Sequence, residues 1–328
     1  MKAIYSWQQD NWQKLAQRYQ QQQFPHALLL YGPSGTGKRD FALELAEAML
    51  CNNNSSLLET ACGQCSACNL LKADTHPDFF MVEPEDEGKA IKIGQVRALI
   101  EKMSLSSHAG GYKIAVICPA EAMNTASANS LLKTLEEPPS DTIIILVSSR
   151  PSALPATLRS RCQMVRMALP EHETALNWLQ QHVNNVNRAE ILLDMSGGAP
   201  LNALRAAEEG LEETYQQMLQ DWLALGRGKA DPVKTAEQWL KVDQNKPIFW
   251  VYEWISQMIR VKSSTDHDNE KNIHFELREL VQNIHLKQLF GLFDEIAGAV
   301  HIAHTQANHL MLLERILIYW SNLPRQQA

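Results

Sequence analysis

The stretch Gly32-Pro33-Ser34-Gly35-Thr36-Gly37-Lys38-Arg39 decides the fold, because it joins an apolar run to a helix-like segment. It fits the phosphate-binding P-loop pattern G-x-x-x-x-G-K-[ST] at every position but the last. In that pattern glycines let backbone N–H groups approach phosphate, the lysine reaches the outer phosphates, and the final hydroxyl binds magnesium. Residues 27–31 before the loop are apolar and residues 40–47 after it are helix-like. We therefore expect a nucleotide-binding ancestry.

Strand and helix patterns alternate around this loop as far as residue 168. Buried strands are predicted at residues 27–31, 79–82, 112–118 and 142–147, and helices at residues 40–47, 93–103 and 124–137. Continuous apolar strands that alternate with helices predict an α/β domain with a parallel sheet buried on both faces. After residue 170 only helical patterns follow, which predicts a small helical domain over residues 169–209 and an all-α domain over residues 210–328.

Composition describes an ordinary globular protein. The chain has 328 residues, 45% of them hydrophobic and 20% charged, which allows two or three domains. A net charge of −7 argues against a protein that wraps nucleic acid by itself. No apolar run approaches the roughly 20 residues of a membrane helix, and the first residues lack the apolar core of a signal peptide. We expect a cytosolic protein without a membrane partner.

The residues that bind magnesium in a P-loop ATPase are missing. Arg39 stands at the hydroxyl position, and the apolar strand pattern runs into Cys118-Pro119 where an acidic pair is required. The first acid, Glu121, lies beyond that point. Hydrolysis is therefore expected to be lost, while weak nucleotide binding stays open. The candidate phosphate-binding residues are Gly32, Gly35, Gly37 and Lys38. The alternative is that these glycines only maintain the tight strand-to-helix turn.

Four cysteines, Cys51, Cys62, Cys65 and Cys68, follow the spacing C-x10-C-x2-C-x2-C. Two close pairs of thiolates suit a tetrahedral zinc ion, and four sulfur ligands predict a closed, structural Zn²⁺ site over residues 51–68. The alternative is a set of incidental buried thiols. His76 lies nearby but is interpreted as a loop histidine, since four cysteines already complete the ligand set. Few basic residues accompany the cysteines, so a structural or docking role is favoured over contact with nucleic acid.

Ser160-Arg161-Cys162 follows the last predicted strand and a turn-rich segment. Arginines on such a loop, here Arg159 and Arg161, are most often solvated surface residues. The alternative is an arginine that stabilises charge on phosphate bound by another subunit.

Several of these stretches resemble the clamp-loader family of AAA+ proteins. The most specific is Ser127-Ala128-Asn129-Ser130-Leu131-Leu132-Lys133-Thr134-Leu135-Glu136-Glu137-Pro138-Pro139, supported by Ser160-Arg161-Cys162, the four cysteines and Thr75-His76-Pro77-Asp78. The motifs span residues 26 to about 204. The resemblance implies that Arg161 acts as an arginine finger on ATP held by a neighbouring subunit. It also implies that residues 169–209 form a lid and residues 210–328 a collar that joins subunits into a ring.

The family's motor subunits carry an intact P-loop, an Asp-Glu pair, and an arginine in the lid where this chain has Leu201. The resemblance therefore implies a non-hydrolysing, stator-like subunit of the replicative polymerase's clamp loader. Its partners would be motor (gamma/tau-type) and delta subunits, with the sliding clamp and primed DNA reached through the complex. No residues suggest polymerase chemistry in this chain. Two other hypotheses stay open: an autonomous ATPase, which Lys38 favours, and a zinc-dependent DNA-binding module.

Overall fold

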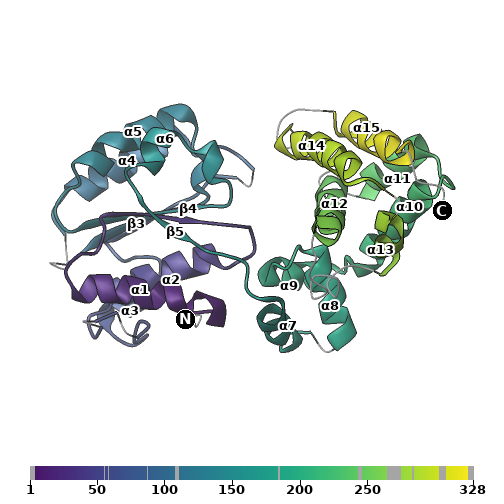
Figure 1. Cartoon of the computed structure of the whole chain (residues 1–328). Coiled ribbons are helices and arrows are strands. Elements are labelled where there is room, and N and C mark those ends of the chain that lie inside the picture. Colours follow the sequence, from purple (N-terminus) through teal and green to yellow (C-terminus); the bar gives the residue numbers. More distant parts are fainter. Residues whose placement is uncertain are drawn as a thin grey trace. The chain divides into compact units, whose positions relative to one another are not determined.

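The computed structural model describes residues 4–323 apart from residues 55, 58, 87, 108–110, 184, 243–245, 264–274, 283 and 303–307. The chain divides into two compact units, Met1–Ala175 and Leu176–Ala328 (Figure 1). The first predicted boundary, after residue 168, precedes helix α7 (His172–Gln180), whereas the division between the units falls inside that helix. The further division into a lid and a collar stays a prediction.

The first unit contains a five-stranded parallel sheet, which confirms the predicted α/β domain. Its strands are β1 (Ala27–Tyr31), β2 (Phe79–Val82), β3 (Lys113–Ile117), β4 (Thr142–Ser148) and β5 (Gln163–Arg166). They lie in the order β2-β3-β4-β1-β5, and every neighbouring pair is parallel. Strands β1, β3 and β4 are almost fully buried, as their continuous apolar sequences predict.

Helices cover both faces of this sheet (Figure 1). One face carries α1 (Gln9–Gln20), α2 (Lys38–Leu50) and α3 (Ser66–Lys72), and the other carries α4 (Ile93–Ser104), α5 (Thr125–Glu136) and α6 (Ala156–Arg159). Short 3₁₀ turns lie at η1 (Ser6–Gln8), η2 (Ala120–Ala122) and η3 (Pro151–Ala153). Along β1, Leu28 and Leu30 enter the core on the α1–α2 side, while Leu29 enters the core on the α4–α5 side. This alternation follows from the two-residue repeat of a strand.

Strand β5 and the short helices α3 and α6 were not predicted. β5 lies at the edge of the sheet, where Gln163, Met164 and Arg166 are exposed. It therefore lacks the apolar run that marks a central strand. α3 has only seven residues, and two of the clustered cysteines, Cys65 and Cys68, lie at or in its first turn.

The second unit is helical throughout its described residues, as predicted. Beyond α7 its helices are α8 (Val186–Met195), α9 (Pro200–Glu209), α10 (Glu212–Gly226), α11 (Pro232–Val242), α12 (Lys246–Ser263), α13 (Phe275–Gln282), α14 (Leu286–Ile302) and α15 (His309–Ser321). Trp222 stacks on Trp320 at 4.3 Å between ring centroids, and the Trp320 indole donates to the Trp222 carbonyl at 2.9 Å. Among the described residues, no helix is both long and apolar enough to cross a bilayer.

Candidate functional site

The P-loop glycines are required by the backbone itself. Gly32 has φ of +152°, and a Cβ there would lie 2.0 Å from the carbonyl oxygen of Met167. Gly37 has φ of +82°, and a Cβ there would lie 2.6 Å from the ring of Tyr5. Only glycine fits both constraints. This geometry supports the alternative that these residues are needed for the turn, whether or not a nucleotide binds.

An N-terminal segment holds the loop through side-chain hydrogen bonds. The Trp7 indole donates to the Thr36 carbonyl at 3.0 Å, and the Gln8 side-chain amide donates to the same carbonyl at 2.9 Å. The Tyr5 hydroxyl donates to the Asp40 carboxylate at 3.0 Å, and its ring stacks on Trp7. The sequence alone did not reveal these contacts, because they join residues about 30 positions apart in sequence.

Lys38 turns back onto its own loop. Its side chain is only 5% exposed, and Nζ donates to the Pro33 carbonyl at 2.5 Å. Burial lowers the pKa of the ammonium group to about 8, an effect that the nearby Glu121 carboxylate partly offsets. The lysine is therefore engaged within the loop.

The residues at the expected magnesium-ligand positions make other interactions in the structure. Arg39 is exposed, and its Nε donates to the Glu83 carboxylate at 2.9 Å. Cys118 follows β3, and burial raises the pKa of its thiol to about 11, so it is neutral near pH 7. Glu121 accepts a hydrogen bond from the backbone N–H of Ser149 at 3.0 Å through one carboxylate oxygen. A neutral thiol and a guanidinium are poor ligands for magnesium, which prefers oxygen.

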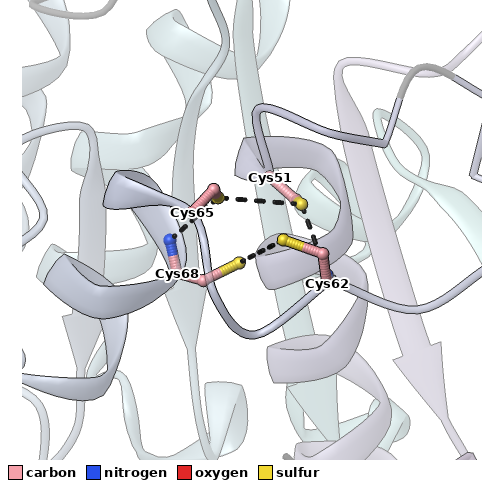
Figure 2. Close-up of side chains that lie close together, drawn as sticks. All are labelled: Cys51, Cys62, Cys65 and Cys68. Carbon is pink, nitrogen blue, oxygen red and sulfur yellow. Dashed lines mark hydrogen bonds between the residues drawn. The ribbon is translucent and has the colours of Figure 1, made fainter.

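The four cysteines converge on one point (Figure 2). All four Sγ atoms lie within 4.8 Å of one another, and the pairs Cys51–Cys65 and Cys62–Cys68 are each 3.9 Å apart. Four sulfurs about 2.3 Å from one tetrahedral zinc ion would lie about 3.8 Å apart. Backbone N–H groups of residues 64 and 65 lower the pKa of Cys62 to about 6, whereas burial and the hydrogen bond to Cys65 raise the pKa of Cys68 to about 12. The cluster could therefore bind a metal such as zinc.

His76 is not part of this cluster, as predicted, but it is not a solvated loop residue either. It is only 7% exposed, and its Nδ1 accepts a hydrogen bond from the backbone N–H of Asp78 at 3.2 Å. The Ser107 hydroxyl donates to the Asp78 carboxylate at 3.1 Å. Among the described residues, Thr75-His76-Pro77-Asp78 thus forms a hydrogen-bonded turn that leads into β2.

Arg161 follows α6 on a turn anchored by its neighbours. Leu158 and Cys162 are buried in the core on the α4–α5 side of the sheet. The Arg161 guanidinium donates through Nη1 to the Thr157 carbonyl at 2.7 Å and through Nη2 to the Glu136 carboxylate. The side chain remains 31% exposed. It is therefore an ordered arginine with a solvent-facing part, unlike a freely solvated surface residue.

The sheet separates Arg161 from the P-loop of the same chain. β1 and β5 are parallel, with Leu28 opposite Gln163 and Tyr31 opposite Arg166. The P-loop follows the carboxyl end of β1, whereas Arg161 precedes the amino end of β5. The length of β1 alone, about 15 Å, lies between these two ends. The structure does not bring the predicted nucleotide-binding residues and the predicted finger together.

Comparison with known proteins identifies the family. The profile of the family described as "DNA polymerase III, delta subunit" matches residues 7–171. The DNA polymerase III subunit delta' of Pseudomonas aeruginosa is 36% identical over 99% of each chain. The chain belongs to the DNA polymerase III delta-prime family. The delta' subunit of Escherichia coli is 35% identical over 61% of this chain and 60% of its own length.

A solved structure described as a DNA polymerase III gamma subunit-related protein from Thermotoga maritima is also similar. It covers 95% of this chain and 98% of its own at 16% identity, with a TM-score of 0.49. This overlap is too loose to add to the sequence relationship with the delta-prime family.

Replacing Lys38 with methionine is expected to stabilise the protein near pH 7. Burial lowers the lysine pKa from 10.5 to about 8, so the unfolded chain binds the proton more tightly and the charged lysine opposes folding below pH 8. At about 1.4 kcal/mol per pKa unit, the charged lysine lowers the free energy of unfolding by about 3 kcal/mol. The variant also loses the hydrogen bond to Pro33, which reduces its net gain by about 1 kcal/mol. Urea unfolding should show the variant's advantage shrinking as pH rises from 8 to 10.5. Lys14→Met, on the exposed side of α1, is the control, and lower stability of Lys38→Met at pH 7 would contradict the expectation.

Atomic emission is expected to find about one zinc ion per purified chain, because four thiolates complete a tetrahedral site. Cys68→Ser should lose most of this zinc and melt at a lower temperature. Cys162→Ala removes a buried cysteine outside the cluster, so it should retain the metal. Equal zinc content in both variants would show that the cluster is not the binding site.

Proposed function

We propose that the chain is a non-hydrolysing subunit of the DNA polymerase III clamp loader that supplies Arg161 to ATP bound by a neighbouring subunit. One observation carries the proposal. The ordered Arg161 lies at the amino ends of the strands, whereas its own P-loop lies at their carboxyl ends. At that place it can act on phosphate only in another chain. Charge that develops on a transferred phosphoryl group is stabilised by such an arginine.

The subunit would serve as a stator in a ring with motor (gamma/tau-type) and delta subunits in the cytosol. Residues 169–209 would form the lid of an AAA+ module, and residues 210–328 would form the collar that joins the ring. The sliding clamp and primed DNA would be contacted through the complex. Zinc at Cys51, Cys62, Cys65 and Cys68 would be structural, because four sulfur ligands leave no coordination position for substrate.

The alternative, an autonomous AAA+ ATPase, is favoured by the retained P-loop glycines and Lys38. Three features count against it. Lys38 is hydrogen-bonded to Pro33, Arg39 is paired with Glu83, and Leu201 stands where motor subunits carry an arginine. Nucleotide binding without hydrolysis stays a separate question for the same loop.

ATP turnover by the purified chain separates these two functions. We expect turnover at the background rate, with or without primed DNA, because no described residue replaces the missing magnesium ligands. The motor subunit, assayed alongside, is the positive control. Turnover that saturates with ATP and disappears in Lys38→Ala would establish the autonomous ATPase instead.

Arg161→Ala is expected to leave the ring assembled but to slow its DNA-stimulated ATPase and clamp loading. In related phosphoryl-transfer enzymes an arginine finger contributes about 10³-fold or more to turnover at its site. Turnover at the one ATP site that this chain completes should therefore be nearly lost. The total ATPase rate of the ring should fall by the part that this site contributes. Assembly should be unchanged, since Arg161 lies outside the predicted collar.

Arg166→Ala is the matched control, because it removes an exposed arginine from β5 nearby. Both variants should be compared in rings reconstituted with wild-type motor and delta subunits. Normal ATPase and loading rates with Arg161→Ala would overturn the finger assignment.

A further inference from the structure

We propose that Glu136 is the positioning residue for the Arg161 finger. The inference rests on the proposed function and adds a second residue to it. Glu136 lies 25 positions before Arg161, and its carboxylate accepts a hydrogen bond from Nη2. The two residues come from α5 and from the turn after α6, and neither element contributes to the P-loop.

Both ends of this ion pair are attached to the rigid core. Glu136 is the last residue of α5, next to Leu135, which is 2% exposed. The Asn124 side chain caps the start of α5 by accepting from the Ser127 backbone N–H at 2.8 Å. The core also holds Cys162, the residue after the arginine. The backbone of Glu136 is therefore held in place, and the hydrogen bond from Nη2 ties the guanidinium to that position.

The two hydrogen bonds restrict the orientation of the guanidinium but engage only some of its N–H donors. Nη1 donates to the Thr157 carbonyl at 2.7 Å and Nη2 donates to Glu136. Because a guanidinium has five N–H donors, the remaining donors can still bind phosphate. Long side chains lose rotamer freedom when they bind, so an arginine held in one geometry beforehand is better prepared to act.

The pair is poorly suited to a purely stabilising role. The Glu136 side chain is 48% exposed, and such surface ion pairs contribute little to stability because water and salt screen them. A nearby carboxylate also opposes phosphate binding, but a triphosphate carries several charges and competes well with one exposed carboxylate. We therefore expect the orienting effect of Glu136 to exceed its repulsion.

Rings reconstituted with this chain as Glu136→Ala, Glu137→Ala, Arg161→Ala or the double variant Glu136→Ala/Arg161→Ala test the proposal. Glu137 is the control, because it is an adjacent exposed glutamate. Glu136→Ala should lower kcat at the finger-dependent site by about tenfold to a hundredfold, the loss that small misplacements of a catalytic group cause. The KM for ATP, ring assembly and the melting temperature should stay close to wild type. Glu137→Ala should behave as wild type.

The double variant separates positioning from a structural role. If Glu136 acts only through Arg161, the double variant should be no slower than Arg161→Ala alone. A slower rate in the double variant than in Arg161→Ala would overturn the proposal. The proposal would also be overturned if Glu136→Ala had a wild-type or faster rate while Arg161→Ala was slow. If Arg161→Ala itself has no effect, the proposed function fails and the positioning role fails with it.

Discussion

Burial of the sheet on both faces determines where chemistry can take place in the first unit. β1 and β4 pair at the middle of the sheet, and their side chains fill two separate cores beneath the helices. Because both faces are covered, the sheet itself can present functional groups only where its strands begin or end. The P-loop follows the carboxyl end of β1, and parallel α/β sheets generally bind ligands at the carboxyl ends of their strands. Arg161 precedes the amino end of β5, so the length of the strands separates it from the P-loop.

The P-loop of this chain is packed tightly against neighbouring segments of the fold. Gly32 lets the loop pass against Met167 after β5, and Gly37 leaves room for Tyr5. Trp7 then bonds to a loop carbonyl. These contacts explain why glycines can remain where the magnesium ligands are missing: the packing of the fold depends on them. A preserved motif is therefore weak evidence for activity when the fold itself needs the same residues.

Much of this fold could be predicted from sequence, because central strands and amphipathic helices leave strong periodic patterns. Four strands were predicted at nearly their observed positions, and the second unit was predicted to be helical. β5 was missed because an exposed edge strand has little apolar content. The cysteine spacing predicted the cluster, since local spacing limits local geometry. The contacts of Trp7 and of Glu136 could not be predicted, because they depend on how distant segments pack.

Helix α2 joins the two special sites of the first unit. It begins at Lys38 in the P-loop and ends next to Cys51, the first cysteine of the cluster. Its 13 residues form a rod about 20 Å long. The cysteine cluster thus lies at the C-terminal end of the helix whose N-terminal end forms part of the P-loop. Packing around the cysteines therefore restrains the end of α2 opposite the P-loop, so that a change in the cluster can reach the loop through a single helix.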